Sequence, residues 1–259
     1  MMRRFLITAA VALLPLAANA AAIANSAAPA DAANLAAPRI AAAPSLPAPY
    51  TATYEVRRNG DALGTATVVF KKLPNGRYEL TSSTVGSEGL AAIAGVSVDE
   101  RSIISVTGGR PETVAYNYRQ KLAWKTRERS MQVDAAGGRI SSTDKDKHYS
   151  PPYRAGVLDR NAINVAVMAD VAAGKSGDMQ YLVPSRDEVE TQVYRSGNSE
   201  RIQTRLGPQR AIRVERIRET SNGRTTTLWL GQDRNYVPLR MLQKEPDGET
   251  IEMRVLSIR

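Results

Sequence analysis

Short strand signals interrupted by a single helix signal constrain the fold of this chain more than any other pattern. From Tyr50 to Arg259, runs of alternating apolar and polar residues are separated by glycine, asparagine and proline turns at intervals of about 8 to 12 residues. This spacing is typical of an antiparallel meander, in which one face of the sheet is dry and the other is wet. We therefore expect a mainly β fold.

Helical spacing of apolar residues occurs in one long stretch, residues 159–174. Its apolar positions recur at four-residue steps, at Ile163, Val167 and Val171. The carboxylate of Asp159 suits the first turn of this helix, and Gly174 suits its end. The expected fold is a curved antiparallel sheet, a half-barrel or open barrel, wrapped around one main α-helix, with a short apolar crossover.

Three segments of the strand prediction depend on where the turns are placed. Residues 122–133 are predicted to form one uninterrupted strand. Residues 188–195 and 200–206 are predicted to be separate strands, with a turn at Gly197-Asn198. Residues 144–149 are polar and are predicted to form a loop.

The N-terminus has the pattern of an export signal. Arg3 and Arg4 precede an apolar run, and the small residues around position 20 fit cleavage between Ala20 and Ala21. The run is shorter than the roughly 20 residues of a membrane span. Residues 1–20 are thus predicted to be a signal peptide, residues 21–49 a disordered tether rich in alanine and proline, and residues 50–259 a single antiparallel β domain. We expect a periplasmic protein with no transmembrane segment after cleavage.

Composition excludes several kinds of chemistry. The chain has no cysteine, so it cannot be lipid-anchored through an N-terminal cysteine, and it has no thiol nucleophile, cysteine-type zinc cluster or iron–sulfur site. Its formal charge is +9, which becomes about +7 (9 minus 2) in the mature chain because the predicted signal carries Arg3 and Arg4. In the envelope, this charge favours anionic lipid headgroups, lipopolysaccharide phosphates or an acidic protein over nucleic acid. A merely arginine-rich exterior is the alternative interpretation.

Polar residues do not form a recognisable catalytic motif. His148 is the only histidine, and we expect it to be exposed. The acid pairs Asp99-Glu100 and Asp187-Glu188 are adjacent in sequence, and neighbouring residues of a strand point to opposite faces. We therefore predict no catalytic, cofactor-binding or metal-binding residue and a protein that is not an enzyme. A hydrolase of envelope polymers would need carboxylates from distant strands.

Apolar residues supply the candidate binding elements. Trp124 and Trp229 are predicted to lie on strands and to anchor the core, with the lining of a cavity as the alternative. The segment containing Leu90, Ile93 and Val96 is apolar and too short for a stable isolated helix. It is interpreted as a short crossover packed on the sheet or as a lid over the mouth of a barrel.

Several of these features occur in a recognisable order. They are Tyr54-Glu-Val56 with Gly64, the apolar stretch of residues 86–98, Trp124, Leu158-Asp159, Leu228-Trp229-Leu230 and Val237-Pro238-Leu239-Arg240. Over residues 50–259 the chain resembles the bacterial envelope family catalogued as domain of unknown function 3108. The resemblance implies an architecture similar to that of the periplasmic lipoprotein carriers, in which a curved half-barrel closes over helices and an apolar cavity. It implies function by analogy alone and carries over no catalytic residue.

These observations favour a non-enzymatic module that binds an apolar envelope ligand, either a lipid or an acylated protein. The alternative is a protein-interaction or scaffold module of the cell envelope.

Overall fold

One antiparallel sheet of fourteen strands dominates the computed structural model, which describes residues 46–89, 92, 95–218 and 223–259. The strands before the helical connection are β1 (Tyr50–Arg58), β2 (Asp61–Lys72), β3 (Tyr78–Gly86), β4 (Ser97–Thr107), β5 (Arg110–Leu122), β6 (Lys125–Asp134), β7 (Arg139–Asp144) and β8 (Lys147–Tyr149). After helix α2 (Ile163–Ala172) come β9 (Gly177–Ser185), β10 (Glu188–Thr204), β11 (Gly207–Ile217), β12 (Thr225–Gly231), β13 (Pro238–Lys244) and β14 (Thr250–Ile258).

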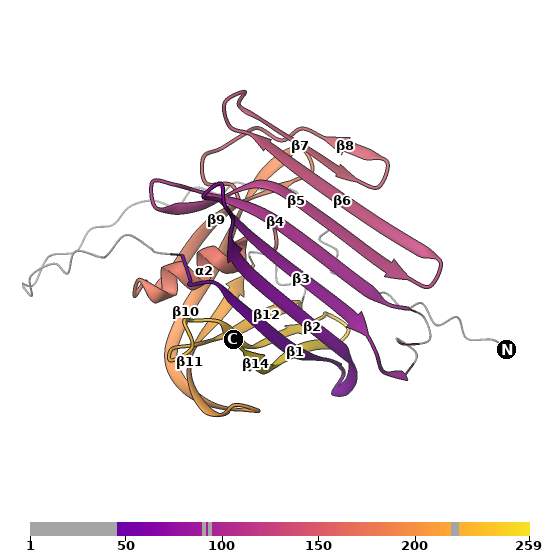
Figure 1. Cartoon of the computed structure of the whole chain (residues 1–259), viewed down its shortest axis with the longest axis vertical. Coiled ribbons are helices and arrows are strands. Elements are labelled where there is room, and N and C mark those ends of the chain that lie inside the picture. The colour runs from indigo at the N-terminus through magenta and orange to yellow at the C-terminus, as the bar shows by residue number, and fades with distance from the viewer. Residues whose placement is uncertain (1–45, 90–91, 93–94, 219–222) are drawn as a thin grey trace, which may run out of the picture. The chain divides into compact units, whose positions relative to one another are not determined.

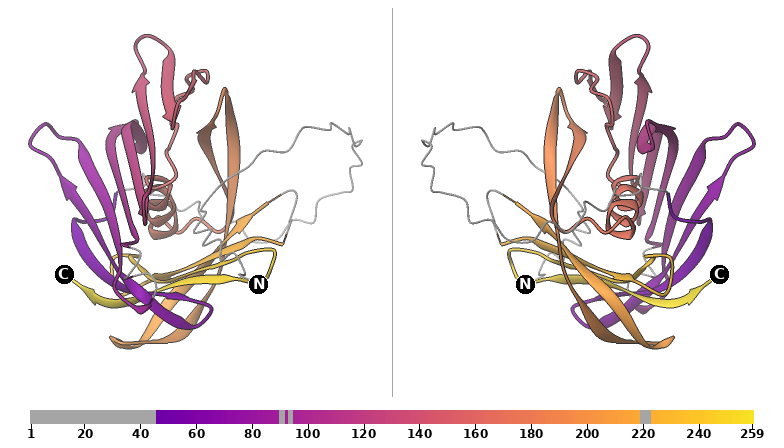
Figure 2. Two further views of the ribbon diagram at one scale, coloured as in Figure 1. Left: turned by 90° about the vertical axis from the view of Figure 1, so that its right-hand side faces the viewer. Right: turned by 90° about the vertical axis from the view of Figure 1, so that its left-hand side faces the viewer.

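The sheet consists of two meanders, β1 to β8 and β9 to β14, which are joined by pairing between the first strand and the last. β1 pairs with β14 in the middle of the sheet, so the edges are β8 and β9, the two strands that flank the helical connection in the sequence. The sheet remains open, and its two arms curve around α2 (Figures 1 and 2). The expected curved antiparallel sheet around a main helix is confirmed.

Helix α2 fills the space between the two arms of the sheet (Figure 2). Eight of its ten residues are buried, because the helix is apolar on nearly every side rather than along one stripe. Core side chains from both arms surround it, and the hydroxyl of Tyr50 lies 3.9 Å from the Sδ of Met168. No helix within the described residues is long and apolar enough to cross a bilayer.

One predicted turn, one predicted strand and one predicted loop are wrong. β10 runs without a break through Gly197-Asn198, where its pairing with β11 shifts in register. A glycine within a strand often marks such a β-bulge, which resembles a turn signal in sequence. Conversely, the predicted strand of residues 122–133 is broken by a two-residue turn at Ala123 and Trp124. This turn lacks glycine, asparagine and proline. The polar segment expected to be a loop contains the short strand β8.

The segment that leads from β8 to α2 contacts strands from both arms of the sheet. Pro152 forms a bridge with Arg139 of β7, and Val157 forms a parallel bridge with Leu182 of β9. The carbonyl of Val157 also accepts a hydrogen bond from the amide of Thr113 on β5, at 2.9 Å. This segment therefore holds together the two edges that strand pairing leaves open.

Asp159 fixes the end of this segment and the start of the helical region. Its carboxylate accepts hydrogen bonds from the amides of Asn161 and Ala162 and from the hydroxyls of Ser102 and Thr113, at 2.8 to 2.9 Å. The predicted contact of this carboxylate with the amides that follow it is therefore confirmed, but Asp159 caps the turn over residues 160–162. The regular helix begins at Ile163, and its N-cap is Ala162, which makes no side-chain cap hydrogen bond. Asp159 is only 3% exposed, and its burial raises the pKa of its carboxyl to about 6.

Replacing Asp159 with asparagine should change how the free energy of unfolding depends on pH. The folded-state pKa is above the unfolded value of about 3.9, so the folded state binds a proton more readily between these two values. The stabilisation from this group is therefore complete below about pH 4 and is lost as pH rises through 6, by about 3 kcal/mol in total. Urea unfolding of wild type and Asp159→Asn at several pH values from about 4 to 7 should show their difference changing by about this amount.

Other acids, such as Glu79 and Glu252, have pKa values lowered by basic partners and make the folded state less stable as pH falls. These contributions are the same in wild type and Asp159→Asn, so they cancel when the two free energies of unfolding are subtracted. A matched Asp178→Asn variant, which alters an exposed carboxylate, provides the control. A difference between wild type and Asp159→Asn that is constant across this pH range would contradict the assignment.

Candidate ligand-binding pocket

A pocket of about 570 Å³ lies where the β4–β5 hairpin, the segment before α2, the helix itself and β9 meet. Its volume is within the range of small-molecule sites. Figures 1 and 2 show that α2 and β9 are neighbours in this part of the molecule. The apolar part of the lining comes from these four elements and consists of Pro111, Ala155, Leu158, Ala166, Ala169, Met179 and Leu182. The two alanines leave space beside the helix that larger side chains would fill.

A hydrogen-bonded group of polar side chains forms one wall of this pocket. Asp170, on α2, accepts a hydrogen bond from the hydroxyl of Tyr181 at 2.9 Å. It also forms an ion pair with the Nζ of Lys175 at 2.7 Å. Burial, followed by the nearby carboxylate of Asp170, raises the pKa of the Tyr181 hydroxyl well above its usual value. The tyrosine therefore stays protonated and acts as a hydrogen-bond donor.

The remaining charged side chains differ in their partners. Asp178 at the rim is held by the guanidinium of Arg195, with two hydrogen bonds of 2.6 and 3.0 Å. Glu112 is buried and accepts a hydrogen bond from the hydroxyl of Tyr153 at 2.8 Å. Arg110 is exposed, and none of the ion pairs among the described residues includes it. The pocket thus combines an apolar floor with an available cation at its rim.

The chemistry of this arrangement suits binding. Tyr181 and Asp170 are hydrogen-bonded to each other, and Glu112 on β5 accepts from Tyr153, which does not line the pocket. Within the described residues, no group of three or more histidine, aspartate and glutamate side chains could hold a metal ion.

Trp124 corrects a prediction, because it does not anchor the core. It is 88% exposed and occupies the two-residue turn between β5 and β6. The strand pattern placed it in a continuous strand, where an aromatic side chain would have one buried face. In a hairpin turn its side chain has no layer of the sheet above it.

Trp229 is buried, as expected of a core anchor. It is 7% exposed and belongs to the main core cluster. Its indole N–H donates a hydrogen bond to Glu200, and the guanidinium carbon of Arg240 lies 4.5 Å from the ring centre. Trp229 is not part of the lining of the pocket beside α2.

Of the remaining predicted site residues the structure describes Val96, which does not line the pocket. Val96 is buried, and its carbonyl accepts a hydrogen bond from the amide of Gly86 at 2.8 Å. Leu90, Ile93 and the predicted cleavage residues Ala20 and Ala21 lie outside the described residues, so the lid and the cleavage site stay predictions.

Asp99 and Glu100 on β4 point to opposite faces of the sheet, as expected, whereas Asp187 lies in the turn that precedes Glu188 of β10. Asp99 accepts a hydrogen bond from Ser83, whereas Glu100 accepts one from Tyr116 and contacts Arg160 on the other face. His148 is exposed and lies 3.2 Å from the hydroxyl of Thr143.

Sequence reasoning missed the polar wall of the pocket. A signal was present, because Asp170 is the only acid within the apolar helix and Lys175 follows shortly after it. A charged residue at a buried position of a helix is rarely unpaired. The partnership of Asp170 with Tyr181, however, depends on the packing of β9 beside the helix.

The two tryptophans should respond differently to an aqueous quencher. We expect iodide to quench Trp124 efficiently in the Trp229→Phe variant, because the Trp124 side chain is 88% exposed. Trp229 in the Trp124→Phe variant should be protected by its burial and should emit at shorter wavelength. Steady-state fluorescence of the two single-tryptophan proteins measures this. Equal quenching of both, in proteins shown to be folded by circular dichroism, would disagree with the structure.

Comparison with known proteins agrees with the geometry. The structure is similar to the crystal structure of a beta-barrel-like protein of domain of unknown function DUF1849 from Brucella abortus, with a TM-score of 0.53 and 11% sequence identity. The similarity covers 83% of this chain and 98% of that one, and it concerns the fold alone. No curated protein matches the sequence. The family described as "Protein of unknown function (DUF3108)" matches residues 50–255, and the chain belongs to this family.

Proposed function

We propose that this chain is a non-enzymatic binding protein of the bacterial envelope and that it takes an amphipathic ligand, a lipid or the acyl group of an acylated protein, into the pocket beside α2. The observation that carries the proposal is the combination of an apolar floor and a charged rim in a pocket of about 570 Å³. The envelope location rests on the predicted export signal of residues 1–20.

The position of α2 limits how much of a ligand the protein can enclose. Because the helix fills the space between the arms of the sheet, an acyl chain would lie against Leu158, Ala166 and Met179 in the pocket. Burial of methylene groups contributes about 0.8 kcal/mol each, so a chain of about twelve carbons offers roughly 10 kcal/mol. Association costs of about 4 to 15 kcal/mol offset much of this gain. The expected affinity is modest and reversible, as suits a carrier or sensor.

Arg110 is the side chain best placed to bind the polar end of such a ligand. Lys175, the other cation of the lining, is already paired with Asp170. A guanidinium can form two parallel hydrogen bonds with a carboxylate or a phosphate. An anionic head group would then pair with Arg110 at the rim, and the acyl chain, directed toward α2, would contact the apolar floor.

Filling the pocket should prevent uptake of the ligand. The mature protein would be purified from periplasm without detergent and measured by native mass spectrometry before and after organic extraction, then incubated with dodecanoic acid. We expect an extra mass that extracts as a lipid, and rebinding of the acid. Ala169→Phe places a large side chain in the pocket and should reduce rebinding by at least about tenfold, because the volume for the chain is lost. This overpacking costs about 1 to 3 kcal/mol of stability.

The matched control is Ala172→Phe, which alters an exposed position of the same helix. Thermal melting of both variants separates loss of the pocket from loss of the fold. A bare mass together with no uptake by the wild type would refute the proposal, as would equal uptake by Ala169→Phe and wild type.

The head-group assignment has its own test at an exposed position. Arg110→Gln should weaken binding of dodecanoic acid by about tenfold, since a charge-assisted hydrogen bond contributes about 1.5 to 3 kcal/mol. Binding of the uncharged dodecanol should change little. Isothermal titration calorimetry with both ligands measures the contrast, and an equal loss for the acid and the alcohol would exclude an ionic role for Arg110.

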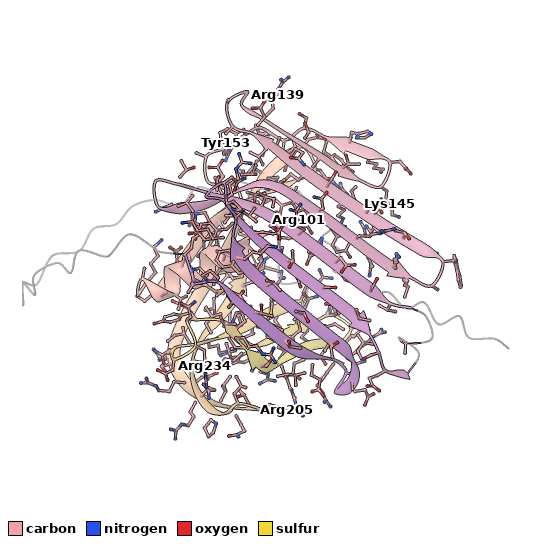
Figure 3. The ribbon with its side chains drawn as sticks, in the orientation of Figure 1. Arg101, Arg139, Lys145, Tyr153, Arg205 and Arg234 are labelled. Carbon is pink, nitrogen blue, oxygen red and sulfur yellow. The ribbon has the colours of Figure 1, made fainter. Side chains whose placement is uncertain are left out.

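A second structural feature supports the alternative, a protein-interaction or scaffold module. A shallow groove of about 610 Å³ crosses β3 to β7 and is lined mainly by polar and charged side chains, including Arg101, Arg119, Glu128 and Lys145. Figure 3 shows Arg101 and Lys145 on the side of the sheet turned away from α2. A wild-type protein that carries and takes up no lipid would shift the assignment to a polar partner at this groove.

A further inference from the structure

The hairpin formed by β5 and β6 ends in an exposed aromatic residue between two lysines. Leu122 pairs with Lys125, so Ala123 and Trp124 form the turn. Lys121 and Lys125 are both exposed, and none of the ion pairs among the described residues includes either of them. We refer to residues 121–125 as the tryptophan tip. It contains no acidic residue.

Strand pairing makes the tryptophan tip project from the sheet. Pairing of β6 with β7 starts at Arg129, so residues 125–128 of β6 extend beyond the end of β7. On its other side, β5 pairs with β4 only as far as Lys121. Figure 1 shows the β5–β6 hairpin reaching farther to the right than the β7–β8 hairpin. The tip is therefore accessible from both faces of the sheet.

A second exposed apolar side chain lies at the same end of the sheet. Val85 is 50% exposed at the end of β3. It pairs with Ser97, which pairs with Lys121. Directly paired residues of a sheet share a face, so Val85 and Lys121 point to the same side, at the end of the sheet where the β5–β6 turn lies. Of the three large hydrophobic residues that are exposed in the described part of the chain, two are found here.

We propose that the tryptophan tip binds the surface of a bilayer that contains anionic phospholipid. A tryptophan ring is most stable at the boundary between headgroups and acyl chains, where its body is in an apolar layer and its N–H is in a wet one. Lysines on either side of the ring then reach the level of the phosphates. The mature chain, without Arg3 and Arg4 of the predicted signal, keeps a formal charge of about +7 (9 minus 2), which attracts it to such a surface.

The size of the tryptophan tip favours a lipid surface over a protein partner. A stable protein interface buries about 800 Å² on each partner and is built from roughly 20 to 30 residues on a side. A projecting two-residue turn with its flanking lysines is much smaller. Insertion into the headgroup layer needs only a small element that protrudes. This proposal is independent of the pocket beside α2.

Vesicle binding by the mature protein tests the proposal. We expect the wild type to cosediment with vesicles made of equal parts of phosphatidylglycerol and phosphatidylethanolamine, and not with vesicles of phosphatidylcholine alone. Each cation near an anionic surface strengthens binding about fivefold, so the double variant Lys121→Gln, Lys125→Gln should bind about 25-fold more weakly. Trp124→Ala should bind about tenfold more weakly. In the Trp229→Phe variant, emission from Trp124 should shift to shorter wavelength on the anionic vesicles.

The neighbouring β7–β8 hairpin supplies a matched control. Lys145→Gln, Lys147→Gln removes the same charge from exposed lysines of a shorter hairpin, and its affinity should fall less than about fivefold. Ala169→Phe, which fills the pocket, should bind vesicles as the wild type does. This comparison separates failure of the membrane proposal from failure of the proposed ligand.

Three results would overturn the assignment. The first is a wild type that stays in the supernatant at low salt. The second is undiminished vesicle binding by Trp124→Ala and by the double variant at the tip. The third is an equal loss in the β7–β8 control, which would show that net charge alone is responsible. If vesicles do not bind but Trp124→Ala weakens a salt-sensitive pull-down, the tip serves an acidic protein and the lipid proposal fails.

Discussion

The burial of α2, in which eight of ten residues are buried, is the constraint on which the rest of the structure depends. A helix that is apolar on nearly every side needs more cover than one flat layer can give. The sheet supplies that cover by curving, with core residues from both arms around the helix. The connection that delivers the helix must then enter between the two open edges. Asp159 and its hydroxyl and amide donors fix this entry point, and they do so with a carboxylate that has almost no contact with water.

The same burial determines where the proposed ligand would bind. A half-barrel with an empty interior would enclose a large apolar molecule, whereas here the helix occupies that space. What is left is a pocket beside the helix, open where small side chains on α2 meet β5 and β9. Its polar wall is held by internal hydrogen bonds, and its rim keeps one cation available. Selectivity would thus come from the rim, and the apolar floor would accept chains of different structure.

Sequence patterns predicted the fold well because its elements follow local rules. Alternation and turn residues located most strands, and helical spacing located α2. The errors occurred where one local signal has two structural meanings. Gly197-Asn198 marks a bulge instead of a turn, and the turn at Ala123 and Trp124 carries none of the residues that usually mark one. As a result, Trp124 was predicted to be in the core although it is the most exposed large apolar side chain in the described residues.

The candidate pocket could not be predicted from the sequence, for a different reason. It is assembled from residues that are far apart in sequence, such as Arg110 on β5, Asp170 on α2 and Tyr181 on β9. None of these residues forms a motif with its neighbours in sequence. Their proximity follows from the curvature of the sheet and from the depth at which the helix lies, neither of which periodicity specifies.

The pairing of β1 with β14 has a consequence for how the domain folds. Each meander can form from strands that are close in sequence, but the seam between them joins residues separated by nearly the whole domain, such as Ala52 and Ile258. Contacts of such high sequence separation form slowly, because the entropy of closing a long loop is lost before they are made. Until the last strand is available, β1 has an unpaired edge and α2 is covered by only part of its sheet. A chain that has not been completed would therefore expose apolar surface that the finished domain conceals.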